Sequence, residues 1–429
     1  MSNDMMTTWS EADIVGPEGE DWRVPVTELE ARLNILSSLL AEAGIGGAII
    51  QHPVDLYYYA GGRQNGSLFV PAKGTTATCE LGGDGPTFFV RRSLRRAIFE
   101  AGGDDAPLNV CSFPSMQGFA QHLKDMGAQG SIGLQHGEIP ASIYMFFNDK
   151  LSLFGQCPDI TAMVHGQREI KSAWEIEMLD AGAVIQLKMF DAVAEVGAEG
   201  VTELELVAAA EAVSRAEGYG GSVQMRRFPM QCDRGVIIAG RAGGIPSFFD
   251  SALGGVGAHP LSSMGSGFNK IKANETVLVD LLHIHRGYVV DATRMFVAGR
   301  LDEKWNSRLE DILAVKDTVV DVLGSGETCQ QAWRQGLALA DEFGHKDNLM
   351  GMNPDQSKFL GHSVGLQLDE TPVVAEGFDR PLPIGGTMAI EPKLVYSDGS
   401  IGSEDTWIRD EDGMRPITAD KAIPWLTEW

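Results

Sequence analysis

The chain of 429 residues lacks paired cysteines, long apolar runs and an excess of basic side chains, and each absence excludes a class of protein. Its five cysteines are scattered and form no Cys-x-x-Cys pair, which argues against a thiolate zinc cluster and favours a reducing compartment. No stretch reaches the roughly 18 apolar residues that a membrane span needs. The polar, acidic segment 1–22 has no apolar core of the kind found in a signal peptide. We therefore expect a cytoplasmic protein.

Basic side chains are scarce: 34 Lys and Arg stand against 59 Asp and Glu, which gives a net charge of −25. A protein that binds nucleic acid needs a basic surface, and an acidic chain is repelled by an anionic membrane. We therefore expect neither nucleic acid nor a membrane as a partner. An acidic chain does suit a site built from carboxylates and filled by cations.

The distribution of apolar residues predicts a flexible leader and two domains. Hydrophobic residues make up 44% of the chain, and at roughly 150 residues per domain its length allows two or three domains. Residues 1–24 form the expected leader. Short strands alternate with helices over 25–164, which predicts an α/β domain; helices and then glycine-rich strands over 165–429 predict an α+β domain.

Helical periodicity is clearest at five places. Leu29, Leu33, Leu36 and Leu40 recur at steps of three and four, and Gly44 ends that helix. In the second domain the pattern predicts a long amphipathic helix, a helix opened by a capping box of Thr202 and Glu205, and two later helices, over residues 171–196, 203–216, 302–323 and 328–343.

Two predicted hairpins carry acidic residues that can lie opposite one another. A turn centred on His285 and Arg286 would pair Asp280 with Asp291. Directly opposed residues of a hairpin have Cβ atoms about 5 Å apart.

The second hairpin turns at Ser397, Asp398 and Gly399, which would pair Glu391 with Glu404. One such pair alone is more often the solvated face of a strand. Two pairs of opposed like charges in one domain call for a compensating cation.

A lone histidine is more often a core or surface residue than a ligand. His362, however, lies between Gly361 and Gly365, which indicate close approach of the backbone, and we take it as a candidate imidazole ligand. Four carboxylates and one imidazole suit divalent Mn, Co, Fe or Zn. Such a set can hold two ions about 3.5–4 Å apart.

Together these segments resemble the metallopeptidase family of prolidase, proline-specific aminopeptidase, methionine aminopeptidase and creatinase. The resemblance implies a catalytic domain of the pita-bread fold and an N-terminal domain with ribonuclease-H-like topology. The family's Asp, ten residues, Asp-x-Thr-Arg pattern matches Asp280 and the segment from Asp291 to Arg294. Its Gly-His motif matches Gly361-His362, and its Glu-Pro-Gly and Glu-Asp segments match 391–393 and 404–405. The resemblance implies metal ligands Asp280, Asp291, His362, Glu391 and Glu404, and a homodimer.

The sequence departs from the family pattern at residues that contact the substrate. Asp369 stands where the peptidases carry a second histidine, and Lys358 where proline-specific members often carry another. The family's Glu-Pro-Gly segment appears here as Glu391-Pro392-Lys393, and Gly402 stands where the family carries an arginine. Only His259 matches the remaining substrate histidine, at a looser spacing.

The resemblance implies a hydrolase in which two ions activate a bridging water. We expect Glu391 to accept the proton, His259 to stabilise the oxyanion, and Asp369 to orient the leaving group or amine. Lys358 is a further candidate for contact with the substrate. The pair Arg226-Arg227 is either a surface feature or a contact for a substrate carboxylate.

Three functions remain open from the sequence. The first is a peptidase for small peptides, with proline after the scissile bond as one option and manganese among the candidate metals. The second is a hydrolase or lyase that acts on a small amine or amide, because the family includes non-peptide enzymes and the residues around the substrate are altered. The third is a binding protein without catalysis, which the complete set of five ligand residues disfavours.

Overall fold

The computed structural model describes residues 19–75, 85–219, 221–228, 230–232, 234–418 and 423–429. The chain divides into two compact units, residues 1–167 and 168–429, while the sequence predicts a boundary near residue 164. Of the expected leader over 1–24, residues 1–18 lie outside the described residues. Val24 is buried, and Arg23 donates a hydrogen bond to the carbonyl of Phe99. No helix in the described part of the chain is both long enough and apolar enough to cross a membrane.

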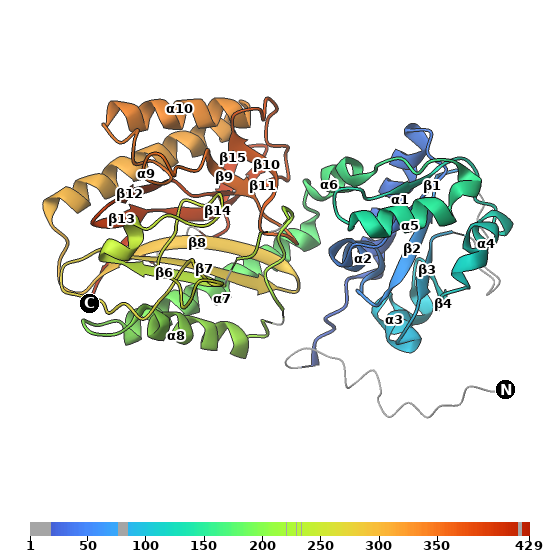
Figure 1. Ribbon diagram of the computed structural model, residues 1–429, viewed down its shortest axis with the longest axis horizontal. Coiled ribbons are helices and arrows are strands. Elements are labelled where there is room, and N and C mark those ends of the chain that lie inside the picture. The colour runs from blue at the N-terminus through green and yellow to red at the C-terminus, as the bar shows by residue number, and fades with distance from the viewer. Residues whose placement is uncertain (1–18, 76–84, 220, 229, 233, 419–422) are drawn as a thin grey trace. The chain divides into compact units, whose positions relative to one another are not determined.

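The N-terminal unit is an α/β domain built on one five-stranded sheet (Figure 1). The strand order is β4-β3-β2-β1-β5, with antiparallel pairs β1–β2 and β2–β3 and parallel pairs β1–β5 and β3–β4. A core of aromatic and aliphatic side chains from β1 to β5 packs against α4 and α5. The elements are α1 (Val26–Glu42), β1 (Gly47–Ile50), α2 (Pro53–Ala60), β2 (Gly66–Pro71), β3 (Thr87–Val90), α3 (Leu94–Glu100), β4 (Asn109–Ser112), α4 (Phe119–Asp125), β5 (Ile132–Leu134), α5 (Ala141–Lys150) and α6 (Thr161–Arg168).

The predicted helices are confirmed. In α1 the stripe of Leu29, Leu33, Leu36 and Leu40 is buried, and Gly44 follows with a φ of +68°. The predicted capping box of Thr202 and Glu205 opens α8, and a second capping box, formed by Ser172 and Glu175, opens α7. The helices of the C-terminal unit are α7 (Ala173–Val196), α8 (Glu203–Ala216), α9 (Glu303–Gly324) and α10 (Cys329–Glu342).

The C-terminal unit is built on a nine-stranded sheet in the order β10-β9-β11-β14-β8-β7-β6, with β15 beside β14 and β16 beside β8. A separate two-stranded ribbon joins β12 to β13. The strands are β6 (Gly235–Ala239), β7 (Val277–His285), β8 (Tyr288–Val297), β9 (Phe359–Ser363), β10 (Glu370–Ala375), β11 (Thr387–Ile390), β12 (Lys393–Tyr396), β13 (Gly399–Gly402), β14 (Glu404–Asp410), β15 (Gly413–Pro416) and β16 (Leu426–Glu428).

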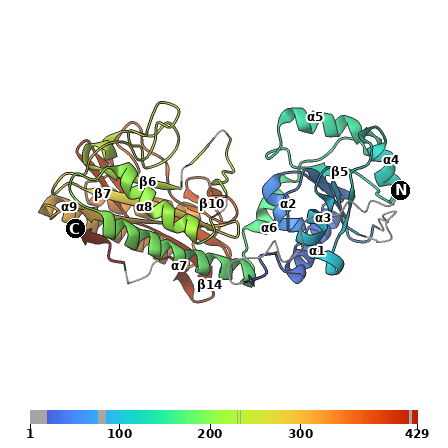
Figure 2. The same cartoon turned by 90° about the horizontal axis from the view of Figure 1, so that it is seen from below.

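Alternation along the strands gives this sheet two buried faces. Val277 and Val279 of β7 pack with α7 and α8, which Figure 2 shows running along one side of the strands. Leu278, the residue between them, packs with α9 and α10 on the other side. Because successive side chains of a strand point to opposite faces, Asp280 lies on the same face as Leu278. The acidic residues of the first hairpin therefore lie on the side of the sheet that α9 and α10 cover.

Candidate metal centre and active site

The first acidic hairpin has a different register from the predicted one. The turn residues are Arg286 and Gly287, with φ angles of +47° and +95°, so the turn is centred one residue later than expected. A two-residue hairpin loop of type I′ needs positive φ at both central residues, which Gly287 adopts easily. Asp280 therefore pairs with Thr293, and the predicted direct pairing of Asp280 with Asp291 is wrong.

The two aspartates nevertheless meet. A shift of the turn centre by one residue moves the pairing by two, which keeps both side chains on one face as diagonal neighbours. Besides burial, the charge of Asp280 helps to raise the pKa of Asp291, as expected when two carboxylates lie near one another. The hairpin thus delivers both acids to one place by a diagonal contact.

The second acidic hairpin has the predicted register. Tyr396 pairs with Gly399 across the turn, and Ile390 pairs with Asp405 farther from it. Continued between these pairs, the same register sets Glu391 opposite Glu404. The prediction of the turn at Ser397–Asp398 is confirmed.

His362 lies in β9, where it pairs with Ala389 of β11. The flanking glycines allow close contacts, as the sequence predicts. A Cβ atom on Gly361 would lie 2.4 Å from the carbonyl oxygen of Ala389, and one on Gly365 would lie 2.6 Å from Oε1 of Glu370. His362 Nε2 lies 3.3 Å from Oε1 of Glu391.

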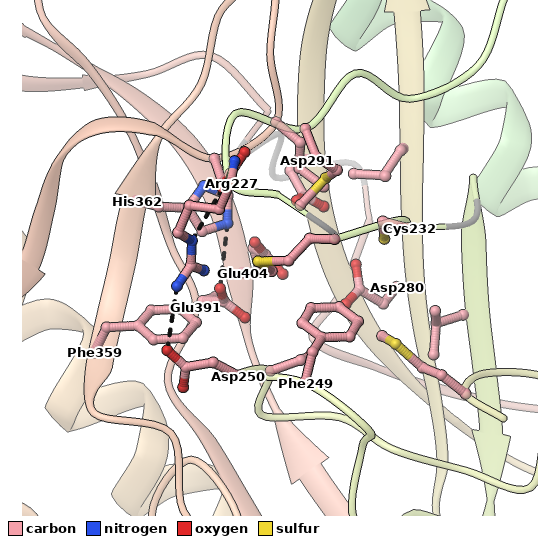
Figure 3. A pocket seen from close by; sticks show the side chains of 18 of the residues that line it. Arg227, Cys232, Phe249, Asp250, Asp280, Asp291, Phe359, His362, Glu391 and Glu404 are labelled. Carbon is pink, nitrogen blue, oxygen red and sulfur yellow. Dashed lines mark hydrogen bonds and ion pairs between the residues drawn. The ribbon is translucent and has the colours of Figure 1, made fainter. Parts of the chain in front are cut away.

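All five candidate ligand residues line one pocket of the C-terminal unit (Figure 3). The pocket holds about 570 Å³ of empty space, part of it open to solvent. One donor atom each from Asp291, His362 and Glu404 lies within 4.8 Å of the others. That spacing suits ligation of a single ion.

Lys393 also reaches this cluster, and the sequence reasoning did not give it a role. Its side chain is fully buried, and its Nζ lies 2.6 Å from Glu391 Oε2, 2.7 Å from Glu404 Oε2 and 3.5 Å from Asp280 Oδ2. The available signal was the lysine in place of the family's Glu-Pro-Gly glycine. The direction of its side chain depends on how the β12–β13 ribbon packs, which the sequence does not give.

Burial and mutual repulsion perturb the acids strongly. Burial, reinforced by the charges of Glu404 and Asp280, raises the pKa of Asp291 well above the usual range. Burial also raises the pKa of Asp280, and it raises the pKa of Glu404 to about 8 although Lys393 opposes the change. Burial would raise the pKa of Glu391 as well, but Lys393 and the imidazole of His362 lower it to about 2.

Neighbouring residues hold the acids in position. Thr293 donates a hydrogen bond to Glu404 Oε2, and Arg294 donates to Asp405 Oδ1 and to the carbonyl of Glu404. These contacts give a physical reason for the Thr-Arg pair that follows Asp291. Arg294 itself lies over the ring of Trp425, 4.2 Å from its centroid.

The donor set fits a divalent ion. Asp291 Oδ1 and Glu404 Oε1 are buried and have no hydrogen-bond partner, although a buried polar atom normally has one. Asp291 and Glu404 are also two of the three residues, with His362, whose donor atoms lie close enough together to hold an ion. Carboxylate and imidazole donors at this spacing suit Mn, Co, Fe or Zn.

Asp369 lines the same pocket but is already engaged. Its carboxylate accepts hydrogen bonds from the backbone N–H groups of Arg226 and Arg227 and from Nε of Arg227. Arg227 also reaches Asp250 at 3.3 Å. Asp369 therefore positions Arg227, and this contact weakens the expectation that Asp369 attracts a cationic substrate group directly.

The other two expected substrate contacts are not brought to this pocket. His259 is exposed in the loop that precedes β7, where its Nδ1 accepts a hydrogen bond from the backbone of Leu261. Lys358 is exposed just before β9. Neither is among the residues that line the pocket. The structure therefore gives no support to the oxyanion role expected for His259 or the substrate contact expected for Lys358.

Apolar side chains form the rest of the pocket wall. They come from the segments before and after β6, from β7 and from the segments around His362, and they include Met225, Met230, Phe249, Met264, Leu282, Phe359 and Leu368. The pocket is thus lined by the charged candidate ligands on one part of its surface and by an apolar wall on the rest. Such a wall can hold an apolar part of a ligand while the charged groups fix its orientation.

Comparison with known proteins gives relatives that match nearly the whole chain. An Xaa-Pro dipeptidase of Pyrococcus furiosus is 23% identical over 391 residues, which cover 91% of this chain and 98% of the relative. A probable dipeptidase PepE of Mycobacterium bovis is 25% identical over 401 residues, covering 89% and 92%. The crystal structure of dipeptidase PepE from Mycobacterium ulcerans has a TM-score of 0.75 at 20% identity, covering 95% of this chain and all of that one. The structural likeness supports the fold.

Two family models cover the units separately. The model of the creatinase/prolidase N-terminal domain matches residues 32–170. The model of metallopeptidase family M24 matches residues 177–411, more than half of the chain, and that family implies divalent metal ions. The protein therefore belongs to metallopeptidase family M24, which confirms the predicted family, the predicted two-domain fold and the expectation of a metal-dependent enzyme of the peptidase kind.

Proposed function

We propose that the protein hydrolyses small peptides, with a preference for dipeptides that carry proline after the scissile bond. The observation that carries this proposal is the pocket itself, which is lined by five candidate ligands, a basic side chain and an apolar wall. A relative that aligns with 91% of this chain is named an Xaa-Pro dipeptidase, which supports the choice of substrate.

Asp291, His362 and Glu404 are the residues we propose to hold a divalent ion, with Asp280 and Glu391 completing the cluster. The chemistry that such an ion supplies when bound is Lewis-acid activation of water and of a carbonyl group. Manganese, cobalt, iron and zinc all suit the donors. The sequence predicts two ions, and the ammonium of Lys393, which lies among these acids, affects how many ions they can hold.

Glu391 remains the proposed acceptor of the proton that water gives up. It lines the pocket, and its lowered pKa keeps it a carboxylate with a lone pair free to accept a hydrogen bond. Lys393 makes it a weaker base than an isolated glutamate, because efficient proton transfer favours a pKa near the working pH. His362 Nε2, 3.3 Å from Glu391 Oε1, helps to orient it.

Arg227 is the proposed contact for the substrate carboxylate. A dipeptide carries an ammonium at one end and a carboxylate at the other. The Arg227 side chain is 38% exposed, so a ligand can reach it, and guanidinium groups bind carboxylates through paired hydrogen bonds. Asp250, half exposed and 3.3 Å from Arg227, is the proposed contact for the ammonium.

A hydrolase or lyase that acts on a small amine or amide is the second candidate. The observation that favours it is the replacement of a neutral substrate histidine by Asp369, which is tied to Arg227. This arrangement changes the charge pattern that faces the ligand. A binding protein without catalysis is the third and least favoured candidate.

The test is a panel of dipeptides assayed with Mn, Co, Fe or Zn in turn. The panel compares Ala-Pro and Leu-Pro with Ala-Ala and Leu-Gly, and includes N-acetyl-Ala-Pro to test the need for a free amine. We expect X-Pro dipeptides to be cleaved fastest, and Asp291→Ala and Glu404→Ala to abolish cleavage. A metal-loaded protein that cleaves none of these peptides would contradict the proposal and favour the second candidate.

Arg227→Gln tests the contact with the substrate. We expect KM to rise about tenfold with a smaller change in kcat, since a charge-assisted hydrogen bond is worth about 1.5 kcal/mol or more. Arg334→Gln is the matched control, because Arg334 forms an exposed ion pair with Glu376. An unchanged KM for Arg227→Gln would move the carboxylate contact elsewhere. The homodimer and the cytoplasmic location stay predictions.

A further inference from the structure

Lys393 is a buried cation placed where a metal cluster would bind its ions. Its side chain has no exposed surface, and its ammonium lies 2.6 Å and 2.7 Å from one oxygen each of Glu391 and Glu404. Asp280 lies 3.5 Å away on the same side. An ammonium group this close to three acids neutralises charge that a second divalent ion would otherwise neutralise.

The neighbouring strand is shaped for this lysine. Gly402 pairs directly with Lys393 across the β12–β13 ribbon. A Cβ atom on Gly402 would lie 2.5 Å from Lys393 Cγ and 3.0 Å from its Cβ, closer than such atoms approach. The absence of a side chain at residue 402 therefore leaves the space that the stem of Lys393 fills. A lysine with a packed stem cannot swing out of the cluster easily.

Glu404 divides its two oxygens between the lysine and an open position. Oε2 accepts hydrogen bonds from Lys393 and from Thr293. Oε1 is buried without a partner, as is Oδ1 of Asp291. Asp291, Glu404 and His362 form the one group of suitable metal ligands found in the described part of the chain.

We propose that the ammonium of Lys393 takes the place of one of the two ions, so that the chain binds a single divalent ion on Asp291, His362 and Glu404. An ion held by the same oxygens of Glu391 and Glu404 would sit about 2.0–2.2 Å from each, in space that the lysine nitrogen already occupies. Asp280 then serves chiefly as a partner of Lys393. The inference concerns the number of ions and does not depend on which bond the enzyme cleaves.

The first experiment counts ions. Elemental analysis and calorimetric titration with Mn and Co are applied to the wild type, to Lys393→Gly and to Lys393→Met, after circular dichroism has established that each is folded. We expect one ion per wild-type chain, two per chain of Lys393→Gly, and one for Lys393→Met, whose side chain fills the same space without charge. Two ions or none on the wild type would overturn the inference, and so would a single ion on folded Lys393→Gly.

The second experiment separates the two aspartates and needs no change at Lys393. We expect Asp291→Asn to weaken the affinity for Mn by at least about 100-fold, beyond the range found for outer-shell partners, and Asp280→Asn to weaken it by about tenfold or less. Equal losses for the two variants would contradict the assignment of Asp280 to the lysine. One bound ion without any peptide cleavage would leave this inference standing and contradict the proposed function.

Discussion

At the scale of single residues, several buried charges of the C-terminal unit lie beside groups of opposite charge. Lys393 lies among three carboxylates, Arg294 donates to Asp405, and Glu370 accepts from Arg168 and Lys171. Removing one member of such a pair leaves an uncompensated buried charge, which costs more than the pair contributes when intact. These residues therefore offer sharp tests of the structure.

Gly402→Ala tests whether Lys393 fills the space opposite it. The added Cβ would lie 2.5 Å from Lys393 Cγ, and overpacking of this kind typically destabilises by about 1–3 kcal/mol. In a Lys393→Gly background the same substitution meets only the backbone Cα of residue 393, at 3.1 Å, so we expect the loss of stability to shrink. Thermal unfolding of the two single variants and the double variant measures the coupling. Additive losses would mean that the two side chains do not meet.

Glu370→Gln tests the buried pair with Arg168 and Lys171. These cations outweigh the effect of burial and lower the pKa of Glu370 from 4.5 to about 2. A carboxyl group whose pKa is lower in the folded than in the unfolded protein stabilises the folded state when it is ionised. That stabilisation is complete above pH 4.5 and is lost as the pH falls towards 2. We expect the variant to lose about 3–5 kcal/mol at pH 7 and the difference from the wild type to shrink below pH 4.5.

The control for this pH profile is Glu376→Gln, which removes the partner of Arg334 in an exposed ion pair. Surface pairs contribute little, so its unfolding curve should follow the wild type at every pH. A constant difference between Glu370→Gln and the wild type from pH 7 to pH 2.5 would show that the charge of Glu370 is not the cause.

At the scale of helices and strands, local signals in the sequence were sufficient where the structure depends on neighbouring residues. The capping box at Thr202, the leucine stripe of α1 and the turn at Ser397 all follow from residues a few positions apart. The prediction places the turn of the first hairpin one residue too early, because a turn centred on His285 and Arg286 leaves out the positive φ that Gly287 adopts. That glycine was the signal that could have corrected it.

The contacts of the site were harder to predict because they join distant segments. The ammonium of Lys393 meets Asp280, more than a hundred residues away in the chain, and Asp369 meets Arg227 across a similar separation. No local pattern determines where such side chains point. The identities of the acids could be read from the sequence, whereas their partners required the packed β12–β13 ribbon and the loop before β6.

Ser172→Ala tests the start of α7, which follows the two cations that hold Glu370. The Ser172 hydroxyl accepts a hydrogen bond from the backbone N–H of Glu175, and the Glu175 carboxylate accepts one from the backbone N–H of Ser172. Loss of such a cap costs about 0.5–2 kcal/mol, and Ser172→Asp should retain most of it, because aspartate caps as well as serine. Thermal unfolding measures both. Equal losses for alanine and aspartate would mean that the serine is needed for another reason.

At the scale of the whole molecule, the two units have separate cores and unequal roles. The N-terminal core gathers around Phe119 and its neighbours, whereas the largest C-terminal cluster joins the sheet to α9 and α10. Every candidate ligand and every residue that lines the pocket belongs to residues 168–429. The free energy of metal binding is therefore available to the C-terminal unit alone.

Calorimetric unfolding should show this division directly. Binding to the folded state stabilises by about 2.7 kcal/mol when the free ion exceeds its Kd by 100-fold. We therefore expect two unfolding transitions, and Mn should raise the midpoint temperature of only one of them. Asp291→Ala should abolish that increase. Phe119→Ala removes a fully buried ring from the N-terminal core. It should lower the midpoint temperature of the other transition, because the unfolding free energy of that unit falls by about 3–5 kcal/mol. A single transition that both Mn and Phe119→Ala move would mean that the units unfold as one, and the stabilisation by metal would then reach the whole chain.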